Sequence, residues 1–178
     1  MNYICILPVG EIREETLISL GKGLEEVLGF SYRISPPINI SDFSYNAERE
    51  QYNAEDIITE IAENMPVTAK KLLGVIDVDL FVPGLNFVFG IAETNSAVIS
   101  LARLKPEFYS KEKDETLFRE RVLKEAIHEL GHTFGLHHCP DKTCVMHFSN
   151  CLEDTDSKST YFCRNCCIII SRKLSRYY

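Results

Sequence analysis

The residues best suited to chemistry lie in one short segment, HELGHTFGLHH, at positions 128–138. On a helix, His128 and His132 are offset by about 6 Å along the axis and about 40° around it, so both imidazoles can reach one metal ion. Glu129 lies about 100° around the helix from His128. From there its carboxylate can hold a water molecule beside the ion instead of binding the ion itself. The spacing therefore predicts a catalytic metal centre.

The residues that follow supply a third metal ligand. Gly135 suits the end of the helix, because a left-handed residue there lets the chain reverse sharply. The reversal can return His138 to the ion, and we expect His138, and not its neighbour His137, to bind. Three histidines with a fourth position left to water are the pattern of a catalytic zinc. The alternative is that His128 and His132 are ordinary histidines on a helix face. A sequence that also has Gly135 and His138 at these positions would rarely arise by chance.

A zinc ion in this setting predicts hydrolysis of a peptide bond. Bound zinc lowers the pKa of its water toward about 7, so the water becomes a nucleophile at neutral pH. Glu129 would act as the general base when that zinc-bound water attacks a carbonyl, and zinc would stabilise the oxyanion. The alternatives are a non-enzymatic zinc-containing module that binds peptides or proteins, and a metallohydrolase for another amide or ester. A binding module needs no base beside its ion, so Glu129 favours the peptidase.

Cysteines form a second cluster, because six of the seven lie at or beyond Cys139. Two pairs lie close in the sequence: Cys139 with Cys144, and Cys163 with Cys166. The second pair has the Cys-x-x-Cys spacing of a zinc knuckle. Four thiolates would close the coordination shell, so we expect a structural zinc, with disulfides or free thiols as the alternative. The four expected ligands are Cys139, Cys144, Cys163 and Cys166. Cys151 or Cys167 could replace one of them, and Cys5 is expected to be an inert buried thiol.

The elements that must position these residues follow from hydrophobic periodicity and turn signals. Apolar runs predict strands over Tyr3–Val9, Phe30–Ser35, Leu73–Val82, Asn86–Ile91 and Ala97–Leu104. Helical spacing predicts an amphipathic helix carrying Leu17 to Val27, a helix from the Asn53 cap to Pro66, and a long helix over Glu115–Phe134 that carries the first two histidines. The polar stretch 39–53 is expected to be irregular.

Strands and helices that alternate in this order predict an α/β protein with a mostly parallel sheet. The tight turn at 94–96 adds one antiparallel strand at an edge. We expect Asn86–Ile91 to be this edge strand and to bind an extended peptide substrate by main-chain hydrogen bonds; an ordinary core strand is the alternative. The stretch Cys166–Tyr178 predicts a packed terminal helix, with a partner-binding tail as the alternative.

Charge and composition narrow the class of partner. The 178 residues carry a formal net charge of −7, which argues against nucleic acid or an anionic membrane as partner. No apolar run approaches the roughly 20 residues that span a bilayer. The N-terminal residues lack the basic region of a secretory signal, so we expect a cytoplasmic protein with reduced thiols. We expect a monomer that acts on a peptide or protein substrate.

The segment from His128 to Cys166 resembles the metzincin signature, HExxHxxGxxH followed by a methionine turn. The residues that follow are typical of fewer proteins. Cys139 directly follows the third histidine, Met146 lies two residues after Cys144, and Cys-Arg-Asn-Cys ends the motif. This combination resembles the archaemetzincins, small zinc metallopeptidases of archaea and some other lineages.

The resemblance implies a twisted mixed sheet with one antiparallel edge strand, two main helices and a small zinc-stapled C-terminal subdomain. One catalytic domain would span 1–178, with an upper subdomain (1–135) that ends in the zinc-binding helix and a lower one (136–178) that holds the methionine turn and the cysteines. Met146 would form the floor of the site without touching zinc. Phe148 stands where some metzincins have a tyrosine ligand, so no further protein ligand is expected. The same resemblance implies two zinc ions in each molecule, a catalytic one on His128, His132 and His138 and a structural one on the four cysteines.

Overall fold

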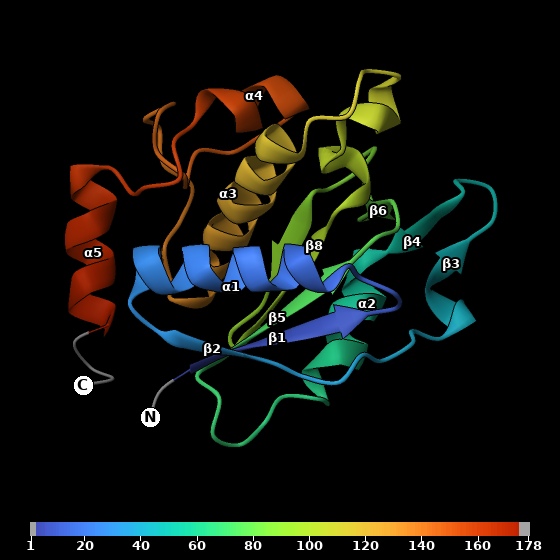
Figure 1. Cartoon of the computed structure of the whole chain (residues 1–178), viewed down its shortest axis with the longest axis horizontal. Helices are drawn as coiled ribbons and strands as arrows, with labels where there is room; N and C mark the ends of the chain where they lie inside the picture. The colour runs from blue at the N-terminus through green and yellow to red at the C-terminus, as the bar shows by residue number, and fades with distance from the viewer. Residues whose placement is uncertain (1–2, 175–178) are drawn as a thin grey trace.

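The computed structural model describes residues 3–174, which form a layered α/β structure (Figure 1). Five strands make the main sheet in the order β2-β1-β5-β8-β7. All of its pairings are parallel except that of β7 with β8. The twisted mixed sheet with one antiparallel edge strand is therefore confirmed. The strands are β1 (Tyr3–Val9), β2 (Ser31–Ile34), β5 (Lys71–Ile76), β7 (Gly90–Ala92) and β8 (Ser96–Ser100).

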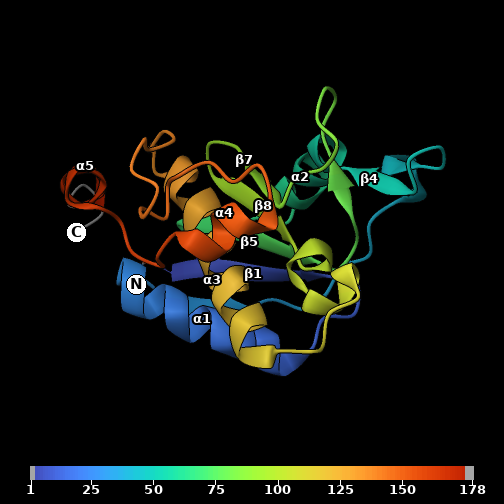
Figure 2. The same ribbon diagram turned by 90° about the horizontal axis from the view of Figure 1, so that it is seen from above.

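Helices cover both faces of this sheet (Figure 2). The two main helices, α1 (Glu14–Leu28) and α3 (Glu115–Thr133), pack on one face, and α2 (Ala54–Ala62) packs on the other. Alternate side chains of β1 therefore enter two different cores: Ile4 faces α1 and α3, whereas Cys5 faces α2. Burial on both faces explains why β1 reads as a continuous apolar run.

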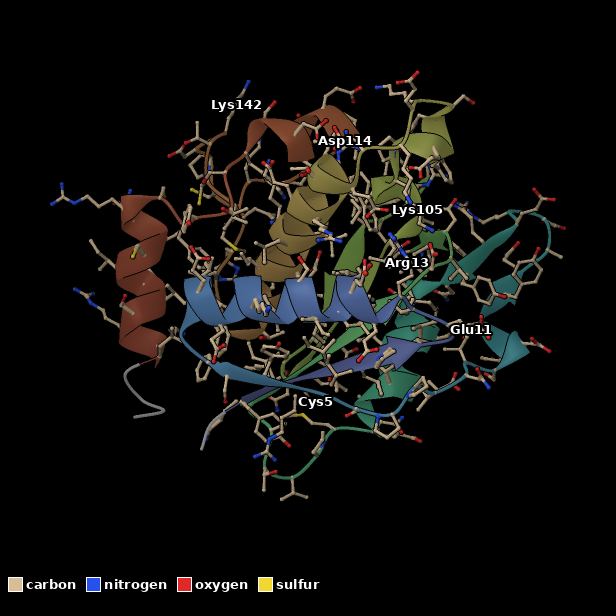
Figure 3. The ribbon with its side chains drawn as sticks, in the orientation of Figure 1. Cys5, Glu11, Arg13, Lys105, Asp114 and Lys142 are labelled. Carbon is tan, nitrogen blue, oxygen red and sulfur yellow. The ribbon has the colours of Figure 1, made fainter. Side chains whose placement is uncertain are left out.

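The first residues of α1 and α3 are tied together at one end of the molecule. Asp114 caps α3, because its Oδ1 accepts a hydrogen bond from the backbone N–H of Leu117 at 2.9 Å. Arg13, directly before α1, donates two hydrogen bonds to the carboxylate of Glu115, at 2.9 and 3.1 Å. Figure 3 labels Asp114 at the start of α3 and Arg13 at the start of α1. The start of the predicted histidine-bearing helix is thus fixed far from the histidines themselves.

The structure corrects four local predictions. The expected edge strand Asn86–Ile91 lies at the edge but begins only at Gly90, because Val88 bridges Leu80 instead of continuing β7. The expected strand Leu73–Val82 is split into β5 and β6 (Leu80–Phe81), because the chain turns at the polar residues between them. The stretch expected to be irregular forms β3 (Tyr45–Asn46) and β4 (Gln51–Asn53). β4 pairs with both β3 and β6, which makes a second, three-stranded sheet. The expected strand Ala97–Leu104 ends at Ser100. Short 3-10 helices occupy Asp42–Ser44, Ala102–Leu104 and Pro106–Tyr109.

The C-terminal part carries two more helices, α4 (Leu152–Ser157) and α5 (Arg164–Leu174). α4 packs on α3, whereas α5 lies at the end of the molecule away from the small sheet (Figure 1). Sequence reasoning missed α4 because its six residues, LEDTDS, are mostly polar. α5 confirms that the C-terminal stretch forms a helix, which is packed only on one side: Cys166 and Ile170 are buried, whereas Ile168 and Ile169 are exposed. Residues 175–178 of that prediction lie outside the described residues. No helix within 3–174 is long and apolar enough to cross a membrane.

Candidate metal centre

The C-terminal turns of α3 and the bend that follows bring the predicted metal-binding residues together. α3 ends at Thr133, and Gly135 then adopts a left-handed conformation, with φ of 82°. The reversed segment is held by a hydrogen bond from the Leu136 N–H to the Gly131 carbonyl, at 3.0 Å. The turn predicted at Gly135 is therefore present, and it directs the following residues back toward the helix.

Backbone carbonyls orient the two histidines of α3. Nδ1 of His128 lies 2.8 Å from the carbonyl oxygen of Val145, and Nδ1 of His132 lies 2.9 Å from that of Leu136. A carbonyl can only accept, so each Nδ1 carries the proton and each Nε2 presents a lone pair. These two Nε2 atoms lie 3.1 Å apart. Two lone pairs at this distance repel each other unless a cation lies between them.

His138 completes the group. Its ring centroid lies 5.3 Å from that of His128 and 4.8 Å from that of His132. One nitrogen from each of the three histidines can be chosen so that all lie within 4.8 Å of one another. His138 is exposed and packs against the ring of Phe148, with centroids 4.8 Å apart, whereas His137 is not part of the group. The structure thus assembles the three histidines expected from the sequence.

The donor set fits a zinc ion. Tetrahedral zinc with Zn–N bonds of about 2.0–2.1 Å holds its nitrogen ligands about 3.3 Å apart, close to the observed Nε2 separation. Burial lowers the pKa of His128 and of His132 below the ordinary value of histidine, and partial desolvation by the neighbouring rings lowers that of His138. All three rings are therefore neutral near pH 7, as metal ligands must be.

Glu129 lies beside the histidines and is buried, with 6% of its surface exposed. β7 passes directly over it: a Cβ added to Gly90 would lie 2.8 Å from Cγ of Glu129. Burial and then the nearby Glu125 carboxylate raise the pKa of Glu129 to about 8, against an opposing effect of Lys158. A carboxyl group with a pKa near neutrality can both accept and release a proton at working pH.

Sequence reasoning missed a buried ion pair next to this carboxylate. Nζ of Lys158 lies 3.0 Å from Oε1 of Glu125, and the two side chains are 0% and 3% exposed. The hydroxyl of Thr155 donates to the same oxygen at 2.9 Å. Glu125 lies one turn before Glu129 on the buried side of α3. This position in the sequence could have indicated that its carboxylate is buried. Lys158 carried no such signal, because only the fold brings it to α3.

Two further contacts hold the α4 segment against α3. Arg121 donates to both carboxylate oxygens of Asp156, at 2.6 and 2.7 Å, and Lys124 donates to the Asp156 carbonyl at 3.2 Å. Met146 is fully buried and packs where Gly131 has no side chain. Ion pairs and apolar packing thus both hold the segment after the histidines against α3.

The four predicted cysteines also converge. One sulfur from each of Cys139, Cys144, Cys163 and Cys166 lies within 4.8 Å of the others. Sγ of Cys139 and Sγ of Cys163 are 3.7 Å apart, far beyond a disulfide bond of about 2.05 Å. Tetrahedral zinc with Zn–S bonds of about 2.3 Å separates its sulfurs by nearly this distance. Cys151 and Cys167 are exposed and lie outside the group.

Cys5 is separate from both clusters. It is buried on β1 (Figure 3). Its thiol lies 2.9 Å from the Ser35 hydroxyl. Burial raises the pKa of this thiol. The expectation of an inert buried thiol agrees with this environment.

Comparisons with known proteins point to one family. A model of peptidase family M54 matches residues 27–172. The protein is 43% identical to an archaemetzincin of Pyrococcus furiosus, over 99% of its own length and 96% of that relative. It is 46% identical to an archaemetzincin of Methanocaldococcus jannaschii, over 92% and 89% of the two sequences.

Solved structures agree with the sequence relatives. The crystal structure of an archaemetzincin from Methanopyrus kandleri superposes with a TM-score of 0.85 and 37% identity, over 99% of this protein and 96% of that one. An archaemetzincin from Archaeoglobus fulgidus, complexed with malonate, gives a TM-score of 0.81 and 38% identity, over 95% and 99% of the two proteins.

Proposed function

The chain belongs to peptidase family M54, the archaemetzincins, and is a zinc metallopeptidase; on this premise we propose which residues carry the reaction. His128, His132 and His138 hold the catalytic zinc, and Glu129 is the general base for hydrolysis of the peptide bond. The observation that carries this proposal is the 3.1 Å approach of the two Nε2 atoms, with the third imidazole beside them. Glu129 follows one of these ligands directly in the sequence.

Different parts of the site carry the separate steps of hydrolysis. When bound, zinc supplies Lewis acidity, which acidifies a water molecule and polarises the substrate carbonyl. The Glu129 carboxylate accepts the proton of the attacking water and delivers it to the leaving amine. The unpaired edge of β7 binds the substrate backbone as an added strand. Gly90 lets that strand lie against Glu129 without a side chain between them.

The four cysteines hold a second, structural zinc, giving two zinc ions in each molecule. Support comes from the 3.7 Å sulfur separation and from their place in the sequence, since Cys139 directly follows His138. Metal binding of this kind contributes about 10–16 kcal/mol in zinc-finger peptides, enough to order a small segment. We therefore assign 136–178 to a lower subdomain stapled by zinc and 1–135 to the upper one, within a single catalytic domain.

The substrate is a peptide or protein, as the family implies. The net charge of −7 supports the proposal that neither nucleic acid nor an anionic membrane is a partner. No disulfide joins any of the seven cysteines, all of which lie within the described residues, and this suits the reducing cytoplasm proposed as the compartment. A monomer contains every residue of both metal groups, so the reaction needs no second copy.

The decisive experiment replaces Glu129 with Gln and measures zinc content together with hydrolysis of a peptide library. We expect the variant to keep two zinc ions and to lose about 10²- to 10⁴-fold in rate, the usual contribution of a general base. Glu112→Gln, on an exposed loop, is the matched control and keeps the parent rate. Equal hydrolysis by the parent and the Glu129→Gln variant would refute the assigned base, and no hydrolysis by either would favour a peptide-binding module.

A further inference from the structure

Lys71 is a buried lysine that belongs to neither metal group. It is the first residue of β5, and only 2% of its surface is exposed. None of the ion pairs within residues 3–174 includes it. Burial lowers its pKa to about 8, which still leaves the ammonium mainly protonated near pH 7. A buried charge without a carboxylate partner costs stability, so the contacts that this ammonium makes point to a functional role.

The ammonium of Lys71 uses all of its hydrogen-bond donors. Nζ donates to the Thr94 carbonyl at 2.7 Å, to Oδ1 of Asn95 at 3.0 Å and to the Thr133 carbonyl at 2.8 Å. An ammonium group has three N–H bonds, and each of them therefore has an acceptor. Thr94 and Asn95 form the turn between β7 and β8, whereas Thr133 ends α3. Lys71 thus joins the turn after β7 to the end of the metal-binding helix.

The contact with Thr133 completes the C-terminal end of α3. The last four carbonyls of a helix have no partner within the helix. Backbone N–H groups of the bend that follows α3 donate to the carbonyls of Leu130, Gly131 and His132. The fourth carbonyl, that of Thr133, accepts from Lys71. A cation at this position also interacts favourably with the helix dipole. Lys71 therefore holds the turn of α3 that carries His132.

β7 is held against α3 at two places. Near its start, Gly90 lies against the Glu129 side chain. Beyond its end, the turn is fixed to β5 by a backbone hydrogen bond from Leu72 N–H to the Asn95 carbonyl, at 3.0 Å, and Lys71 extends this connection to α3. The spacing between β7 and α3 is thus set on both sides of the strand that is proposed to bind the substrate.

We propose that Lys71 is a positioning residue for the peptidase reaction. Its ammonium fixes the spacing between β7 and the metal-binding end of α3, so that a peptide paired with β7 presents its bond to Glu129 and the zinc ligands. Lys71 acts through the turn and through Thr133, and it contacts neither substrate nor metal. The proposal rests on the proposed function, because it takes β7 as the strand that binds the substrate and Glu129 as the base.

The first test replaces Lys71 with Met and measures kcat and KM on a peptide that the parent cleaves. kcat should fall by about 10- to 100-fold, because a displacement of about 1 Å in a reacting group costs on the order of 10²-fold in rate. KM should stay within about threefold of the parent, since the edge of β7 can still pair with the substrate. Both zinc ions should remain bound.

Lys22→Met is the matched control, because Lys22 is an exposed lysine on α1, and it should keep the parent kcat. A parent value of kcat in the Lys71→Met variant would overturn the proposal. A loss that appears only in KM would overturn it as well, since it would show that the contact affects binding of the substrate and not its alignment.

Thermal unfolding distinguishes positioning from a purely structural role. Lys71→Met removes a buried charge together with three hydrogen bonds, and these two effects oppose each other. The melting temperature should therefore stay within about 4 °C of that of the parent. A much larger fall, with a parent kcat at a temperature where the variant is still folded, would show that Lys71 serves stability alone.

Asn95→Ala tests the same contact from the exposed turn. It removes one of the three acceptors and should lower kcat by about 3- to 10-fold, the usual effect of one hydrogen bond. In the Lys71→Met background it should cause no further loss, because Asn95 acts through the ammonium that is already absent. An equal loss in both backgrounds would contradict the proposal.

Hydrogen exchange of the zinc-loaded protein separates this proposal from the proposed function. The amide of Glu93 closes the turn by donating to the Ser96 carbonyl, and the amide of Phe134 donates to the Leu130 carbonyl in the last turn of α3. Both amides should exchange at least about tenfold faster in Lys71→Met than in the parent and in Lys22→Met. Unchanged exchange refutes the role of Lys71 whether or not the parent is active. Faster exchange in a protein that hydrolyses no peptide would support the contact and refute the peptidase assignment.

Discussion

Nε2 of His128 and Nε2 of His132 face each other at 3.1 Å, while Nδ1 of each ring is held by a backbone carbonyl. These carbonyls belong to Val145 and Leu136, which lie on the two sides of His138 in the sequence. The segment that carries the third ligand therefore also orients the first two. Such hydrogen bonds fix the ring orientation and tautomer of a metal ligand before the metal binds.

The stability of the metal-free protein should fall as the pH falls below about 6.5, the ordinary pKa of histidine. Burial lowers the pKa of His128 and of His132 in the folded state, so in this range the unfolded state binds more protons than the folded one. Acid therefore favours unfolding. Thermal unfolding of chelator-treated protein between pH 8 and pH 5 measures this dependence.

His128→Gln removes one of these buried groups and should flatten the pH dependence. His137→Gln is the control, because His137 is exposed and outside the metal group, and it should reproduce the parent curve. A parent protein that becomes more stable as the pH falls from 6.5 to 5 would contradict the burial of neutral rings.

Cys166→Ser should reduce the zinc content from two ions to one and destabilise the C-terminal part of the protein. Cys166 is buried in the sulfur group, and three thiolates close the coordination shell less well than four. Cys167→Ser changes the adjacent, exposed cysteine and should keep both ions. Metal analysis and thermal unfolding of the two variants check the assignment. It fails if Cys167→Ser loses a zinc ion and Cys166→Ser keeps both.

Lys158→Met should destabilise the fold by about 3–5 kcal/mol, because it leaves the Glu125 carboxylate buried without its partner. The double variant Lys158→Met with Glu125→Gln should recover much of this loss, since neither charge remains. Urea unfolding of the parent, both single variants and the double variant gives the coupling energy. Additive losses would show that the two side chains do not stabilise each other.

Gly90→Ala should lower peptidase activity while both zinc ions remain bound. The added methyl group would meet the Val98 carbonyl oxygen at 2.6 Å and Cγ of Glu129 at 2.8 Å, so either β7 or the Glu129 side chain must move. A shift of about 1 Å in a reacting group costs on the order of 10²-fold in rate. Steady-state kinetics measure the loss, and zinc content and circular dichroism confirm an intact fold. An activity equal to that of the parent would mean that the contact with β7 does not determine the position of the Glu129 side chain.

The parts predictable from sequence are those whose geometry is local. His128 and His132 converge because a helix brings residues four apart to one face, and Gly135 reverses the backbone within a few residues. The cysteines lie in two distant segments, but the chemistry of thiolates marked them as one group. The edge position of β7 followed from the tight turn before β8.

The parts that could not be predicted depend on contacts between distant segments. The break between β5 and β6 reflects pairing of β6 with β4, nearly thirty residues earlier, which no local pattern records. Glu125 and Lys158 are separated by more than thirty residues, so only the fold reveals that they form an ion pair. α4 is held to α3 through Arg121 and Asp156, so its stability comes from a partner that its own polar sequence does not reveal.

The most direct test of the catalytic assignment is anomalous diffraction at the zinc edge from crystals of the zinc-loaded protein. The account predicts one zinc about 2.0–2.1 Å from a nitrogen of each of His128, His132 and His138, with the fourth position open to solvent, and a second zinc among the four sulfurs. A catalytic-site zinc without His138, or with a protein side chain in the fourth position, would contradict it.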